Sequence, residues 1–254
     1  MRAAALLVIA LWTVPAFAAE TPLSLYKSGQ FAQAEAAGIA QNDSAGFAIA
    51  ARAVLAEDMM RDQPCLDCLR HAEDLARRAI AADPKVPEGH IYLAAAIGYE
   101  ARIIGNIAAQ SKGYADEAKR ELDTALASDP NDAWALAAMG SWNIEIVRSA
   151  GPTLARWLFG AHFAAGRDYY AKAFAAEPAN LVIRYQYALT LAAYNLADYQ
   201  KDIENELAHA ASGTSGSTYE TFVKSRAREL LDTLKRGDMA AAQRLVRHDQ
   251  GYPS

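Results

Sequence analysis

The sequence predicts an all-α fold, and three observations carry the prediction. Alanine dominates the composition and is supported by leucine, glutamate, lysine, arginine and glutamine, which all form helices readily. Apolar residues recur at helical spacing over long segments, and no strand pattern is present. Three segments, 79–84, 125–130 and 173–178, end in the same way. We therefore expect a series of antiparallel helix hairpins.

The three shared endings explain where helices stop and start. Each runs Ala-x-Ala, then a small residue, then Asp or Glu, then Pro; a looser copy lies at 37–43. The alanines allow close approach of a neighbouring helix, and the proline ends the helix because it cannot continue the hydrogen-bond ladder. Apolar periodicity resumes after each proline and predicts new helices over 88–109, 132–147 and 181–196.

The C-terminal third predicts helices that cover the end of the stack. A helical pattern over 202–211 is broken by Gly, Ser and Thr at 212–217. Ser217 and Glu220 have the spacing of an N-terminal cap, which predicts a helix to residue 234. This helix and a short one at 239–246 are expected to cap the fold. Residues 19–247 would form one helical domain, and 248–254 a frayed tail.

These features resemble the tetratricopeptide repeat, a helix–turn–helix unit, over most of residues 21–235. Four residues match its second-helix signature: Ala118, Leu122, Ala125 and Pro130. Met139 and Gly140 match the leucine–glycine pair of the next first helix, and 26–34 carries the family's tyrosine, turn glycine, aromatic residue and alanine. The resemblance implies stacked hairpins.

The period of the repeat departs from that family. Pro84 and Pro130 are 46 residues apart, and Pro130 and Pro178 are 48 apart, against about 34 in the standard unit. The hairpins are therefore elongated, with extra turns around 103–113 and 149–166. A right-handed α-solenoid and a compact bundle of long hairpins both remain open, each with a C-terminal capping helix.

A finer resemblance lies in the third unit. The run 139–142, Met-Gly-Ser-Trp, is followed by Leu-Phe-Gly at 158–160. This is similar to the regulator-of-microtubule-dynamics type of tetratricopeptide domain over about residues 119–195. The resemblance implies a related helical architecture, in which some members hold lipid in an apolar tunnel; it carries no microtubule role over.

The first residues predict a targeting segment. Arg2 gives a positive start, 3–14 an apolar stretch, and 16–18 an Ala-Phe-Ala cleavage site. We expect a cleaved signal peptide at 1–18 of bacterial type, and hence a periplasmic or secreted protein. No later stretch is apolar and long enough to predict a membrane helix.

The sequence offers little catalytic chemistry. Cys65 and Cys68 favour a local disulfide over free thiols or a redox pair, because no strand–helix–strand pattern surrounds them; no second pair completes a zinc site. The five histidines are scattered, and no nucleophile elbow, phosphate loop or His-Glu-x-x-His motif occurs. We expect no enzyme, cofactor or metal. The net charge of −5 argues against nucleic-acid binding.

The resemblance to the repeat implies that the first helix of each unit lines a concave face. The candidate ligand-binding residues there are Ile91, Tyr99, Arg102, Trp134, Ser141, Ile144, Glu145, Tyr185 and Leu189. Most inward positions are apolar or small, so a clamp for acidic peptide ends is not expected. The face is either open, as a site for a helix, lipid or small molecule, or filled as core; the filled alternative is favoured.

The sequence therefore predicts a non-catalytic adaptor that binds a protein partner in the cell envelope. The alternative is a carrier for a lipid or another apolar small molecule, serving as an accessory to transport. A third alternative is a spacer or oligomer scaffold. Fold is weak evidence for choosing among them.

Overall fold

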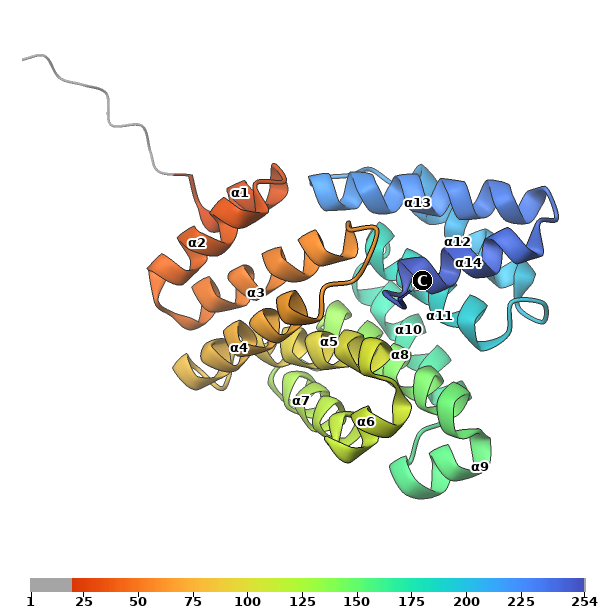
Figure 1. The fold of residues 1–254 in the computed structure, drawn as a ribbon, viewed down its shortest axis with the longest axis horizontal. Coiled ribbons are helices and arrows are strands. Elements are labelled where there is room, and N and C mark those ends of the chain that lie inside the picture. The colour runs from red at the N-terminus through yellow and green to blue at the C-terminus, as the bar shows by residue number, and fades with distance from the viewer. Residues whose placement is uncertain (1–19, 254) are drawn as a thin grey trace, which may run out of the picture.

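The fold was analysed in a computed structural model that describes residues 20–253 (Figure 1). The predicted signal peptide at 1–18 lies outside the described residues. Within them every regular element is a helix, so the predicted all-α class is confirmed for this part of the chain. In chain order the helices are α1 (Pro22–Lys27), α2 (Phe31–Gln41), α3 (Ser44–Met59), α4 (Leu66–Ala82), α5 (Pro87–Ile104), α6 (Asn106–Ser111), α7 (Tyr114–Ser128), α8 (Ala133–Ala150), α9 (Pro152–Leu154), the π-helical turn η1 (Ala155–Phe159), α10 (Phe163–Ala176), α11 (Leu181–Asn195), α12 (Gln200–Ser212), α13 (Thr218–Lys235) and α14 (Met239–Asp249).

The long helices pack as successive pairs. α3 packs on α4, α5 on α7, α8 on α10, α11 on α12, and α13 on α14. The first helix of each pair also packs on the second helix of the pair before it, as α5 does on α4 and α13 on α12, and first helices contact one another, α5 with α3 and α8, and α11 with α8 and α13 (Figure 1). The first helix of each pair therefore faces the interior of the molecule, and the second helix lies outside it.

The three shared endings stop helices as the sequence predicts. α4, α7 and α10 end at Ala82, Ser128 and Ala176, each two residues before the proline. The next helices are capped by side chains: Asp132 accepts from the backbone N–H groups of Trp134 and Ala135 at the start of α8. Such caps satisfy N–H groups that lack a partner inside the helix.

One predicted helix is divided and one helix was not predicted. The segment 88–109 breaks at Gly105, whose φ of 83° lies outside the helical region, so the chain turns there from α5 into α6. No helix was predicted for the segment that forms α3. Its residues between Phe47 and Ala56 are nearly all buried, so the helix lacks the polar face that periodicity detects.

The first helix, α1, contacts α13 of the last pair, so the two ends of the helical array meet. The hydroxyl of Thr218 at the start of α13 lies 3.4 Å from the carbonyl oxygen of Lys27 at the end of α1. Gly29 has a φ of 82°, and a Cβ atom there would lie 2.7 Å from the Thr218 hydroxyl. α1 and α13 face each other across this contact in Figure 1.

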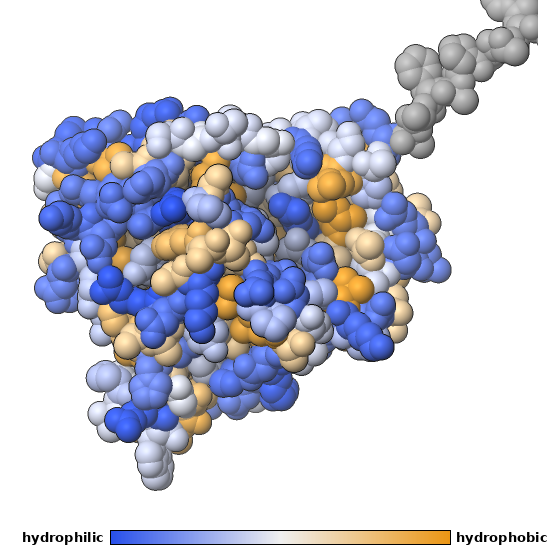
Figure 2. Space-filling model, turned by 180° about the vertical axis from the view of Figure 1, so that it is seen from behind, coloured by the Kyte–Doolittle hydropathy of each residue, from blue (hydrophilic) through white to orange (hydrophobic). Residues whose placement is uncertain are grey.

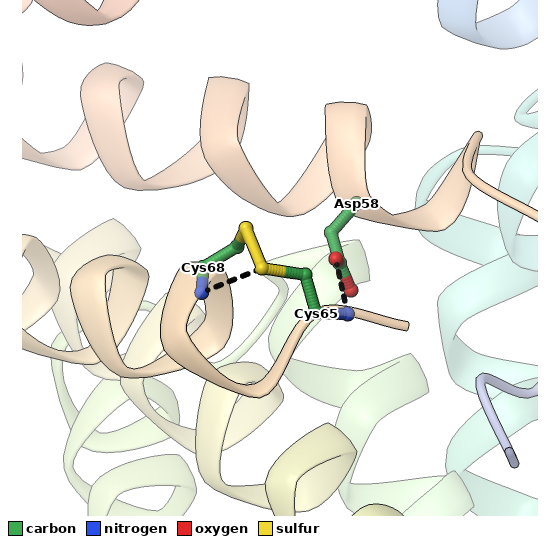
Figure 3. A group of neighbouring side chains, drawn as sticks. All are labelled: Asp58, Cys65 and Cys68. Carbon is green, nitrogen blue, oxygen red and sulfur yellow. Dashed lines mark hydrogen bonds between the residues drawn. A yellow bond between two sulfur atoms is a disulfide. The ribbon is translucent and has the colours of Figure 1, made fainter. Parts of the chain in front are cut away.

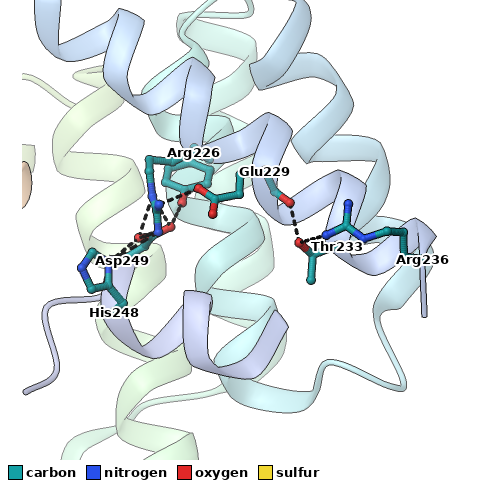
Figure 4. A network of polar contacts seen from close by, with 7 residues as sticks. Arg226, Glu229, Thr233, Arg236, His248 and Asp249 are labelled. Atoms are coloured by element: carbon teal, nitrogen blue, oxygen red, sulfur yellow. Dashed lines mark hydrogen bonds and ion pairs between the residues drawn. The ribbon is translucent and has the colours of Figure 1, made fainter. Parts of the chain in front are cut away.

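The sequence predicts a frayed tail over 248–254, but residues Asp249 and Gln250 are docked against the rest of the fold. The Asp249 carboxylate accepts from Arg226 of α13 at 2.5 Å and from the phenol of Tyr185 of α11 (Figure 4). The side chain of Gln250 is buried and donates to the carbonyl oxygen of Leu189. Sequence patterns do not reveal this, because a short polar tail looks the same whether or not buried partners await it.

Two glycines set the crossing of α8 and α10. A Cβ atom at Gly140 would lie 2.7 Å from the ring of Tyr170 and 3.0 Å from the backbone oxygen of Gly166. One at Gly166 would lie 2.6 Å from Ile144. The backbones therefore approach more closely than side chains permit.

None of the helices in residues 20–253 has the length and hydropathy that crossing a membrane needs.

We expect Gly140→Ala to lower the free energy of unfolding by about 1–3 kcal/mol, because the added methyl group overpacks this crossing. Gly98→Ala in α5 is the matched control, since a Cβ atom there meets no atom within 4 Å. It should raise stability by about 0.5–1 kcal/mol through helix propensity. Urea denaturation measures both; equal effects of the two changes would contradict the close crossing.

Candidate functional site

A cavity of about 670 Å³ lies in the interior, between the first helices of the pairs. α5 and α8 supply the largest parts of its wall, and α3, α6, α7 and α11 contribute most of the rest together with single residues from other segments. Apolar and small side chains predominate, among them Leu55, Ile97, Ala138 and Ile183. The volume falls within the range of about 300–1,000 Å³ that is usual for small-molecule sites.

The cavity extends along two helices. Its wall follows α5 from Ile91 to Gly105 and α8 from Trp134 to Ala150. At 1.5 Å per helical residue each stretch is about 20 Å long or slightly more. The cavity therefore has the length to take an extended apolar chain lying along α5 and α8.

One end of the cavity reaches the surface beside α6. Gly105, Asn106 and Ile107 line it and are exposed, as is Ser149 near the end of α8. Ile107 is 90 % exposed although it is large and apolar. The opposite end lies among Tyr26, Arg52 and Trp134 (residues that belong to α1, α3 and α8). In the view of Figure 2 the outer surface is otherwise mainly polar, with apolar residues in separate patches.

Six of the nine candidate residues from the sequence line this cavity: Ile91, Tyr99, Arg102, Trp134, Ser141 and Glu145. The other three, Ile144, Tyr185 and Leu189, are buried in the core. Docking of the C-terminal residues accounts for two of them, since Tyr185 bonds Asp249 and the Leu189 carbonyl accepts from Gln250. The inner positions of α11 are thus filled at Tyr185 and Leu189, whereas Val182, Ile183 and Gln186 of the same helix line the cavity with α5 and α8.

Charged groups near the α6 end balance one another. Glu145 accepts from Arg148 at 2.5 and 3.0 Å, and the hydroxyl of Tyr252 lies 3.1 Å from the same carboxylate. Burial opposes ionisation of Glu145, but the hydrogen bonds from Arg148 and the charge of Arg102 outweigh it and lower the pKa of Glu145. Arg102 also donates to the Gln250 carbonyl at 2.7 Å. These contacts hold the C-terminal tail against the cavity wall.

The sequence analysis missed a charged residue at the other end. Arg52 is the only charged residue between Ser44 and Ala56, within a run of alanine and larger apolar residues. Its guanidinium lies 4.4 Å from the ring centre of Tyr26 and 5.7 Å from that of Trp134. A lone arginine in an apolar segment was the available signal, but α3 itself was not predicted.

The expected link between Cys65 and Cys68 is present as a disulfide at the start of α4 (Figure 3). The Cys65 N–H donates to the Asp58 carboxylate at 2.9 Å, and the Cys68 N–H to the Cys65 sulfur. The three side chains lie close enough to suggest a metal site. Sulfurs joined to each other offer no thiolates, however, so the group acts as a staple between α3 and α4.

Two neighbouring carboxyl groups, Glu100 of α5 and Glu73 of α4, lie outside the cavity. Glu100 is buried and accepts from the phenol of Tyr114 at 3.1 Å, and Arg70 lies 3.8 Å away. Burial and the neighbouring carboxylate of Glu73 raise the pKa of Glu100 to about 7. Neither glutamate lines the cavity. The pair therefore bears on stability near neutral pH and does not contribute a group to the site.

Comparison of the chain with protein-family models finds no match, and comparison with curated proteins finds none either.

We expect the stability of the protein to fall as pH rises through about 7. In the folded protein Glu100 holds a proton that the unfolded chain loses near its ordinary pKa of 4.5, so its contribution is complete below that value and disappears above about 7. Glu100→Gln mimics the protonated acid and should flatten the profile, raising the melting temperature at pH 8 by about 2–4 °C. Parallel pH profiles for the wild type and the variant would contradict the assignment.

Proposed function

We propose that the protein binds a lipid or another apolar small molecule in the cavity between α5 and α8, as a carrier or accessory binding protein without catalysis. The observation that supports this most is the combination of volume and shape: about 670 Å³ distributed along two helices and lined mainly by apolar side chains. The predicted signal peptide supports a role outside the cytoplasm, as part of the same proposal.

The binding energy of such a ligand would come from apolar burial. Removing apolar surface from water stabilises a complex by about 25 cal/mol per Å². The side chains of Leu55, Ile91 and Ile97 already present apolar surface to the cavity in fixed positions. A preformed wall lowers the ordering cost of association.

A protein-adaptor role remains the second proposal, and it rests on a different surface. The short segment of α9 and η1 protrudes from the fold (Figure 1). It exposes Leu154, Trp157 and Leu158, of which Trp157 is 84 % exposed. Exposed tryptophans are enriched where proteins bind partners. Both roles can coexist, since this segment and the cavity contain different residues, except Phe159.

We also propose that the helix pairs are elongated tetratricopeptide-type units in a right-handed array. Support comes from the inward position of each first helix and from Gly140, which stands in the family's leucine–glycine pair and allows the close crossing with α10. The contact between α1 and α13 favours a closed arrangement over an open superhelix.

Protein purified from its own cell under native conditions should release an apolar molecule of several hundred daltons into organic solvent. Native mass spectrometry before and after extraction measures the difference. A protein that is consistently free of such a molecule, and that binds no apolar probe, would contradict the carrier role and leave the adaptor role.

Filling the cavity should abolish binding of an apolar probe. Gly98 lines the cavity and a Cβ atom there meets nothing within 4 Å, so Gly98→Phe can place its ring in the empty space. We expect affinity for the neutral fluorophore N-phenyl-1-naphthylamine to fall about tenfold or more, equivalent to about 1.4 kcal/mol or more.

Ala175→Phe, at an exposed position of α10 outside the cavity, is the matched control and should keep the probe affinity of the wild type. Melting temperatures of both variants show that they are folded. Equal probe binding by the two variants would place the probe elsewhere on the protein.

A further inference from the structure

Arg52 stands apart from other half-buried arginines in this protein. Arg148, Arg184 and Arg226 each pair with a carboxylate at 2.5–2.7 Å. In residues 20–253 no carboxylate oxygen lies within the 4.0 Å salt-bridge distance of the Arg52 guanidinium. Burying a charge without a partner is costly, so an unpaired guanidinium in a cavity wall needs a physical reason.

The immediate neighbours of Arg52 are aromatic, and the carboxylate that acts on it, Glu220 of α13, lies beyond salt-bridge distance. Tyr26, Tyr92, Trp134 and Tyr219 line the same part of the cavity. Burial raises the pKa of Tyr92 to about 12 and those of Tyr26 and Tyr219 above the ordinary value, so the phenols keep their protons at neutral pH. These groups stack on the guanidinium or offer O–H donors, and they supply no negative charge.

The charge of the whole cavity wall is positive although the chain as a whole carries −5. The lining contains two arginines, Arg52 and Arg102, and one glutamate, Glu145. Glu145 lies close enough to Arg102 for the arginine charge to lower its pKa, whereas Arg52 lies at the opposite end. Glu220 acts on Arg52 only from beyond salt-bridge distance, so the hydrogen-bonding positions of the guanidinium that face the cavity have no carboxylate partner among residues 20–253.

We propose that the cavity takes a single-chain amphiphile with a carboxylate head, which pairs with Arg52 while the apolar chain extends between α5 and α8 towards Ile107. The inference rests on the proposed function, because it names the class of ligand for the same cavity. A planar guanidinium matches a carboxylate with two parallel hydrogen bonds. A single compensating charge suits a monoanion better than a phosphate dianion.

The alternative is that Arg52 has only a structural role. Stacking over Tyr26 and Trp134 would then account for its position. The two roles differ in what the cavity prefers: a structural arginine gives no preference between a charged and a neutral head on the same chain.

Displacement of N-phenyl-1-naphthylamine by laurate and by dodecanol tests the proposal, because the two competitors have the same chain length and differ in head charge. Wild-type protein should bind laurate about tenfold more tightly than dodecanol, as one charge-assisted pair predicts. In Arg52→Gln this ratio should fall to about one while dodecanol still displaces the probe. Arg52→Lys should retain part of the preference.

Arg102→Gln distinguishes direct pairing of the laurate carboxylate with Arg52 from attraction by the overall positive charge of the cavity wall. It removes a charge of the same sign from the other end of the cavity. It should reduce the laurate preference less than Arg52→Gln does. A ratio near one in the wild type, an unchanged ratio in Arg52→Gln, or equal losses in both variants would overturn the carboxylate proposal.

Failure of the underlying function has a different outcome. If dodecanol and the neutral probe do not bind, or if Gly98→Phe leaves their binding unchanged, the cavity is not the site at all. If both neutral compounds bind and Gly98→Phe blocks them, the apolar site stands and only the laurate preference decides the role of Arg52.

Discussion

The carboxylate of Asp249 lies beneath α13, held by the guanidinium of Arg226 and the phenol of Tyr185 (Figure 4). A buried charge of this kind is stable only with its partners in place, so the contact fixes the end of the chain against α11 and α13. The next residues then extend across the interior. The side-chain amide of Gln250 donates to the carbonyl oxygen of Leu189 in α11, and the hydroxyl of Tyr252 donates to the carboxylate of Glu145 in α8. This anchored tail determines which part of the inner surface is core.

The same anchoring shapes the cavity. The tail fills the inner surface of α11 at Tyr185 and Leu189, whereas several positions of α5 and α8 that face the cavity carry alanine or glycine, among them Ala95, Gly98 and Ala138. Small side chains at these positions leave space between the helices, because the packing of each pair sets the distance between their axes. The cavity lies where this space remains.

Electrostatics give the cavity two unlike ends. Near α6, Glu145, Arg148 and Tyr252 form a closed network in which each charge has a partner. Near α3, Arg52 has aromatic neighbours, and within the described residues 20–253 Glu220 acts on it only from beyond salt-bridge distance. A ligand with one charged end and one apolar end would match this asymmetry, and it would enter in a defined orientation.

The Glu73–Glu100 pair, between α4 and α5, adds a separate dependence of stability on pH.

The sequence by itself determined the helical class and the three proline endings, and six of the nine candidate residues that it indicated line the cavity, because these features depend on local propensity and on similar positions in similar segments. Only the tertiary structure shows that Tyr185 and Leu189 are buried in the core and that Arg52 lines the cavity. Tyr185 became core through Asp249, which lies 64 residues away in the chain. Arg52 lies on a helix buried on nearly all sides, whose pattern has no polar face to reveal it. Contacts between distant segments leave no periodic trace in sequence, so only their arrangement in space could show which inner positions are filled and which remain open.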